Sequence, residues 1–224
     1  RTFWMHGYFR KWLGDIRGGT GNPDWFGNLV SLPWRHYWEY GDRRILEENY
    51  SSMKRVADFW AAEAPERIWV KGFGDWLAPN AGTWESYHND REVVNTALFA
   101  HWTQVVGETA SLLGHTADAE RYARTVREVG DALQQKLYNV AEATYGDGSQ
   151  TTSILPLALG LVPPEHRAAV TRQLLATVRG KDKEHLNTGL YGTRYLLDVL
   201  CDAGEENLGL HMLLQPEYPG VDRK

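Results

Sequence analysis

Apolar residues recur at three- and four-residue spacing along most of the 224-residue chain, whereas the two-residue alternation of strands is almost absent. This pattern predicts an all-α protein. The expected helices cover residues 3–17, 25–40, 45–60, 92–113, 117–138, 150–159, 164–178, 193–202 and 205–214. Because only a short joint beginning with Gly41 and Asp42 separates the second helix from the third, these two helices should form an antiparallel pair.

Two segments interrupt the helical pattern. Pro33 falls inside the second helix, so either the first turn of that helix is irregular or the helix begins near Leu32 with the proline early. Residues 67–82 are rich in glycine and aromatic side chains, and residues 139–148 are predicted to be a loop. On a helical scaffold, a loop such as 67–82 is where function is expected.

The later helices alternate in character. Residues 150–159 are almost wholly apolar, whereas the helix over 164–178 carries Arg167 and Arg172, with Arg179 just after it, on an outward face. An inner helix followed by an outer one fits an (α/α) toroid or an open solenoid. Because no repeat of fixed period is present, the toroid is favoured.

A complete toroid of six helix pairs needs more helices than this chain offers. We therefore expect residues 1–224 to form a single helical domain that is a partial (α/α)6 barrel. An incomplete barrel should expose apolar inner faces, such as residues 154–161, and should self-associate or lack a partner segment.

Composition excludes some classes of function. The net charge of −5 is spread along the chain without runs of like sign, so nucleic acid is not an expected partner. No stretch of 18 apolar residues predicts a membrane span, and the residues from Arg1 to Arg10 do not resemble a signal peptide. The only cysteine, Cys201, is expected to be a small buried hydrophobe, and a single cysteine leaves the compartment open.

All ten tryptophans lie between Trp4 and Trp102. Such rings can pack against the C–H face of a pyranose, or they can simply fill the core between helices. The cluster of Glu85, Asn89 and Asp90 is better explained by capping of the next helix than by acid catalysis. The eight histidines show no metal-ligand spacing, and no phosphate loop is present, so neither a metal nor a cofactor is expected.

Several short motifs occur in an order that resembles the middle of the α-L-rhamnosidase catalytic domain. They are Lys11 to Ile16, Trp25, Pro33-Trp34, Tyr40 to Asp42, Gly74 to Pro79, Asn95 to Phe99, Ser149 to Thr151, His185 to Gly189, Gly192-Thr193, Leu213 to Gln215 and Tyr218-Pro219. Each motif is weak alone, but their order runs the length of the chain. The resemblance implies an (α/α)6 barrel that hydrolyses terminal α-L-rhamnose with inversion.

Inversion uses one carboxyl group as acid and another as base, roughly 6.5–9.5 Å apart. The resemblance implies that the proton donor precedes the matched motifs and that the base follows Tyr218-Pro219. The catalytic residues are therefore unknown within this chain. A second hypothesis is a non-catalytic helical module that binds sugar or protein through the same aromatic face.

The resemblance also implies sugar-binding residues. Trp25 and Trp76 match rhamnose-facing aromatics, and Asp75 either accepts bonds from sugar hydroxyls or caps the amides of its own loop. His185 either faces the funnel or makes a structural hydrogen bond. One departure is Gly27, where the family commonly has aspartate; Asp24 could compensate from the other side of Trp25.

Overall fold

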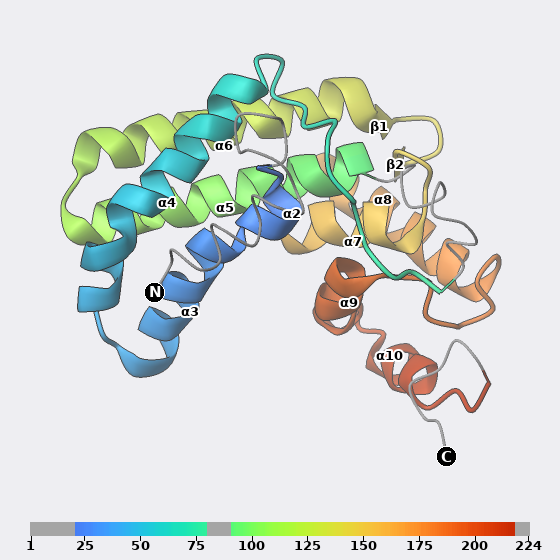
Figure 1. Cartoon of the computed structure of the whole chain (residues 1–224). Helices are drawn as coiled ribbons and strands as arrows, with labels where there is room; N and C mark the ends of the chain where they lie inside the picture. The colour runs from blue at the N-terminus through green and yellow to red at the C-terminus, as the bar shows by residue number, and fades with distance from the viewer. Residues whose placement is uncertain (1–20, 80–90, 218–224) are drawn as a thin grey trace.

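The structure is a computed structural model that describes residues 21–79 and 91–217 (Figure 1). In these residues the chain is mostly helical, which confirms the all-α prediction in its main point. The helix predicted over residues 3–17 and the cluster of Glu85, Asn89 and Asp90 lie outside the described residues.

The second predicted helix is divided in two, α2 (Pro23–Phe26) and α3 (Asn28–Tyr40), so the alternative with an irregular first turn is correct. The break falls at Gly27, where a Cβ atom would lie 2.1 Å from Nε1 of Trp102 and 2.6 Å from the carbonyl oxygen of Pro23. Only glycine allows so close an approach, and the Trp102 indole donates a 3.2 Å hydrogen bond to that carbonyl. Pro33 is accommodated inside α3.

Helix α3 ends at Gly41, whose φ of 66° gives the left-handed cap typical of glycine. The chain then returns as α4 (Arg44–Glu63), which packs on α3. Its buried stripe of Leu46, Tyr50, Met53, Ala57 and Trp60 has helical spacing. Because two residues after Gly41 suffice to reverse the chain, the antiparallel pair predicted from the sequence is confirmed.

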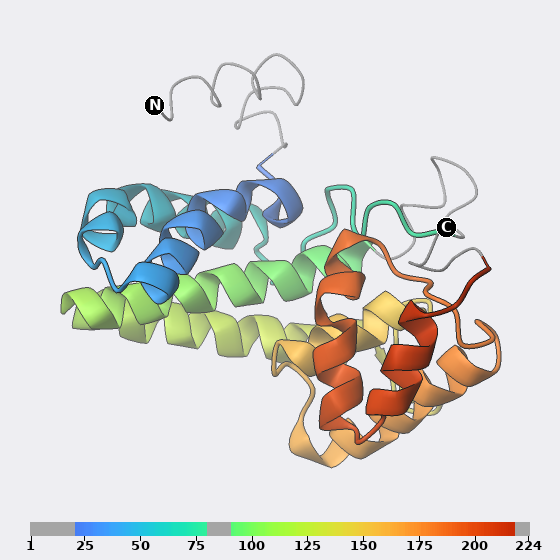
Figure 2. The ribbon, with the colours of Figure 1, turned by 90° about the horizontal axis from the view of Figure 1, so that it is seen from below.

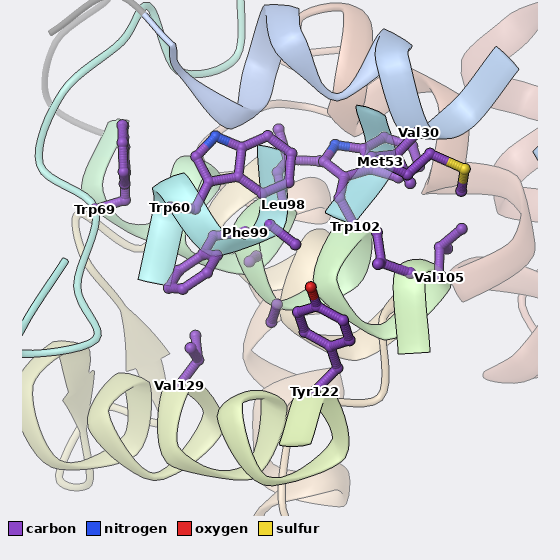
Figure 3. Packing of buried hydrophobic residues seen from close by; sticks show 14 of the residues in the cluster. Val30, Met53, Trp60, Trp69, Leu98, Phe99, Trp102, Val105, Tyr122 and Val129 are labelled. Carbon is purple, nitrogen blue, oxygen red and sulfur yellow. The ribbon is translucent and has the colours of Figure 1, made fainter. Parts of the chain in front are cut away.

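Helices α5 (Arg91–Leu113) and α6 (Thr116–Leu137) form a long hairpin. Most residues of α5 are buried, because the helix lies between α2, α3 and α4 on one side and α6 on the other (Figure 2). Helix α6 is amphipathic and covers α5 with one face only. In Figure 3 the aromatic rings of Trp60, Phe99, Trp102 and Tyr122 fill the space between these helices.

The predicted loop at 139–148 contains a short antiparallel hairpin, β1 (Tyr138–Asn139) and β2 (Thr144–Tyr145). The remaining helices are α7 (Gln150–Ala158), α8 (Pro164–Arg179), α9 (Leu190–Asp202) and α10 (Glu206–Leu213). Helix α7 is buried from Gln150 to Leu157, and α8 turns its three arginines outward, so the inner and outer assignment is confirmed. The described residues contain no helix with the length and apolar character needed to cross a membrane.

Two expectations about exposure are wrong. Most of the segment 154–161 is covered, because α7 packs against α5, α8 and α9, and Ile154 and Leu155 have no exposed surface. The large exposed apolar side chains include Trp38, Tyr40 and Leu210. Cys201 is exposed, since α9 buries the neighbouring Val199 and Leu200 instead.

Candidate functional site

The hydrogen bonds of His185 are to the carbonyl of Lys183 and to Gln150 of α7. The other predicted site residues, Trp25, Asp75 and Trp76, lie where four segments meet. These segments are α2, the connection from α4 to α5, the start of α5 and the start of α9. The main chain itself joins two of them, because the amide of Leu190 donates a 2.9 Å hydrogen bond to the carbonyl of Trp76. Figure 2 shows the start of α9 beside the connection between α4 and α5.

Trp25 and Trp76 are brought into contact, with ring centroids 5.1 Å apart. Phe73 completes the group: its ring stacks on Trp76 at 5.4 Å and meets the edge of Trp25 at 6.4 Å. All three side chains are partly exposed. We call Trp25, Phe73 and Trp76 the aromatic wall. Phe73 was not among the predicted site residues, although Gly72 and Gly74 on either side of it indicate an unusual backbone that presents a side chain.

Asp75 lies behind the aromatic wall and is only 5 % exposed. Its carboxylate accepts hydrogen bonds from the Thr151 hydroxyl and from the amides of Gly189 at 2.6 Å, Tyr191 at 2.7 Å and Gly192 at 3.3 Å. These amides begin α9, where helical N–H groups lack partners within the helix. Of the two roles weighed for this residue, capping is the one the geometry displays, but the capped amides belong to α9 and not to its own loop. Burial raises the pKa of Asp75, although Thr151 and the three amides act to lower it.

His185 lies in the turn that precedes α9. Its Nδ1 atom is 2.8 Å from the carbonyl oxygen of Lys183, and its own carbonyl accepts a 3.0 Å bond from the Gln150 side chain. The same side chain also donates to Asp182 at 2.8 Å. The structural hydrogen bond weighed for His185 is therefore present.

Asp24, beside Trp25, is a buried carboxyl group that the sequence suggested only as a substitute for the aspartate missing at Gly27. Its Oδ2 atom accepts a 2.6 Å bond from the amide of Phe73, and its own amide donates to Oδ1 of Asn95 at 3.2 Å. The Tyr191 hydroxyl donates to its carbonyl oxygen. Burial raises the pKa of Asp24 to about 6, and the amide of Phe73 opposes that rise.

The buried Asp24 carboxyl predicts a specific pH dependence of stability. Because its pKa is 3.8 in an unfolded chain and about 6 in the folded protein, the folded state binds more protons between these values. Relative to the Asp24→Asn variant, the wild type should be most stable below the unfolded pKa and should lose about 3 kcal/mol as pH rises through 6. Urea unfolding of both proteins at about pH 4, 5 and 7 measures this difference. A difference that stays constant with pH would contradict it.

The described residues contain no group of three His, Cys, Asp or Glu side chains placed to hold a metal ion. The aromatic wall presents the partly exposed rings of Trp25, Phe73 and Trp76. Such a surface suits a small ligand that combines C–H faces with hydroxyls.

Comparison with known families identifies the family of the chain. The model of the bacterial α-L-rhamnosidase six-hairpin glycosidase domain matches residues 6–222. The chain belongs to this family. The six-hairpin α-L-rhamnosidase domain confirms the family resemblance of the sequence motifs and the helical-hairpin fold expected from them.

Similar proteins share this assignment. An α-L-rhamnosidase of Alteromonas sp. (strain LOR) is 31% identical over 217 residues, which are 94% of this chain and 23% of that protein. The structure of the α-L-rhamnosidase from Dictyoglumus thermophilum is 29% identical with a TM-score of 0.81, covering 96% of this chain and 27% of that one. The structure of the Streptomyces avermitilis α-L-rhamnosidase complexed with L-rhamnose is 29% identical with a TM-score of 0.76. The match covers 86% of this chain and 18% of that one. The chain thus spans about a quarter of the length of the α-L-rhamnosidases it matches.

Proposed function

We propose that this chain is the part of an inverting α-L-rhamnosidase that supplies the aromatic wall of the rhamnose site. The observation that carries the proposal is the contact between Trp25 and Trp76, which are 51 positions apart in the sequence and only 5.1 Å apart between ring centroids. A relative with the same fold is described in complex with L-rhamnose, which supports this choice of sugar.

The chemistry of the wall suits a deoxy sugar. The C6 methyl group and the axial C–H bonds of rhamnose form an apolar surface that can pack on indole rings, while the indole N–H groups can reach hydroxyls. Packing on Trp25 and Trp76 would fix the terminal sugar and leave its anomeric carbon accessible. We assign His185 to the side of this site, and we assign Asp75, which is buried behind the wall, the role of holding Trp76 in place through its bonds to α9.

Hydrolysis with inversion requires an acid that protonates the leaving oxygen and a base that activates water on the opposite face of the ring. We assign both carboxyl groups to flanking sequence, before and after the motifs present in this chain. The contribution of this chain is to bind and orient the sugar, which lowers the entropic part of the barrier.

Titration of the intrinsic tryptophan fluorescence with L-rhamnose tests this function. L-Mannose is the matched control, because it differs from L-rhamnose by a hydroxyl on C6. If the wall binds the methyl group, L-rhamnose should quench the fluorescence and bind about fourfold more tightly than L-mannose, as expected for burial of one methyl group. Equal affinity for the two sugars, or no response to either, would contradict the proposal.

A further inference from the structure

The aromatic wall is built on segments that have little structure of their own. Helix α2 is four residues long, and its N-cap residue Asn22 makes no side-chain capping bond. Phe73 and Trp76 lie in a connection without helix or strand. Because a single helical turn is unstable in isolation, tertiary bonds must fix the relative positions of Trp25, Phe73 and Trp76.

Asp24 makes those bonds. Its side chain accepts from the Phe73 amide at 2.6 Å, its own amide donates to Asn95 on α5, and its carbonyl oxygen accepts from Tyr191 on α9. One residue therefore ties α2, the wall connection, α5 and α9 together. Adjacent to it in the sequence is Trp25, so the position of Asp24 also determines the position of that ring.

The backbone at Gly72 leaves room for the carboxyl group of Asp24. Gly72 has a φ of 108°, and a Cβ atom there would lie 2.8 Å from Oδ2 of Asp24 and 2.7 Å from Nδ2 of Asn95. A side chain at position 72 would therefore displace the carboxyl group or the amide. Glycine is the residue that can adopt this backbone and allow so close an approach of the carboxyl group.

Burial of Asp24 and Asn95 also lowers the stability of the fold. Oδ1 of Asp24 and Nδ2 of Asn95 are buried and have no hydrogen-bond partner among the described residues. A buried polar atom without a partner destabilises the fold, so stability alone does not explain why a side chain with an acceptor oxygen occupies this position. A role in holding the wall does explain it.

We propose that Asp24 is a positioning residue of the sugar site, whose carboxyl group holds Phe73 and thereby Trp76 against Trp25. This inference rests on the proposed function for its purpose, but the arrangement of the wall can be measured without any sugar. Two indole rings in contact give a near-UV circular dichroism band, and the part of the band that disappears in Trp76→Phe reports the wall.

The test compares this band in Asp24→Ala, Asp24→Asn and Met53→Ala. Asp24→Ala removes the acceptor for the Phe73 amide and should lose most of the band while keeping its far-UV helical signal. Asp24→Asn retains a side-chain oxygen that can accept from Phe73, so it should restore the band. Met53→Ala is the structural control, because it leaves a cavity in the core between α3, α4 and α5 and should keep the band.

Binding of L-rhamnose gives the second readout, and Asp24→Ala should weaken it about tenfold while Asp24→Asn stays close to wild type. The proposal is overturned if folded Asp24→Ala keeps the band, or if Met53→Ala loses it to the same extent. If Asp24→Ala does not fold, hydrogen exchange of the Phe73 amide in the wild type tests whether that amide is bonded to Asp24. Protection comparable with the α5 amides supports the bond to Asp24, and free exchange overturns it.

The two proposals fail in different ways. A wild-type protein that shows the band but does not respond to L-rhamnose contradicts the proposed sugar site and leaves the positioning role of Asp24 intact. A wild-type protein that binds L-rhamnose with an unchanged affinity in folded Asp24→Ala contradicts the positioning role alone.

Discussion

Replacing Trp76 with alanine is expected to weaken L-rhamnose binding about thirtyfold, because a tryptophan that packs on a ligand commonly contributes about 2 kcal/mol or more. Trp76 contacts both other members of the aromatic wall, so the variant loses its own ring and also the support that it gives to Trp25 and Phe73. Fluorescence of the remaining tryptophans or calorimetry measures the affinity.

Trp38→Ala is the matched control for this prediction. Trp38 is 70 % exposed and lies on α3, in contact with Trp34 and outside the aromatic wall. Its removal should leave L-rhamnose binding unchanged. If Trp38→Ala and Trp76→Ala weaken binding equally, the sugar does not bind at the wall.

Replacing Asp75 with alanine is expected to lower the free energy of unfolding by about 4 kcal/mol. The variant leaves the Thr151 hydroxyl and the amides of Gly189, Tyr191 and Gly192 without their buried acceptor. These donors lie at the start of α9, so the helix should fray from this end and release Trp76. Urea denaturation, analysed with the slope as well as the midpoint, measures the loss.

Asp198→Ala provides the comparison on the same helix. Asp198 is exposed on α9, and its removal should change stability by no more than about 0.5 kcal/mol. An equally small effect of Asp75→Ala would mean that solvent replaces the carboxylate at the α9 amides. The role given to Asp75 in holding Trp76 would then be wrong.

Periodicity predicted the long helices well, because burial of one face at helical spacing depends on few tertiary details. It was less informative about helix breaks and side-chain exposure, which depend on tertiary contacts. The sequence left open whether the first turn of the second helix is irregular, and the close approach of Trp102 to Gly27 at the break between α2 and α3 is a tertiary contact that no local pattern contains. The exposure of Cys201 and the burial of Ile154 depend on which neighbours cover each helix, and apolar character alone does not specify those neighbours.

The sequence likewise predicted only some residues of the candidate site. Trp25 and Trp76 were found through motifs that resemble a family, and the structure places them in contact. Phe73 and the tethering role of Asp24 were missed because their roles come from contacts between loops and helix ends, for which the sequence offers no periodic signal. Among these residues only Gly72 and Gly74, which flank Phe73, indicated that the connection has a special backbone.

We propose that this chain carries the sugar-binding wall and that the catalytic carboxyl pair lies in flanking sequence. The most direct measurement follows hydrolysis of p-nitrophenyl α-L-rhamnopyranoside by the 224-residue chain together with its tryptophan fluorescence on addition of L-rhamnose. We predict quenching without turnover, and quenching in Trp76→Ala that requires about thirtyfold more L-rhamnose. Turnover that Trp76→Ala weakens would place an acid and a base within these residues and contradict the claim, and the absence of both signals would contradict the sugar site itself.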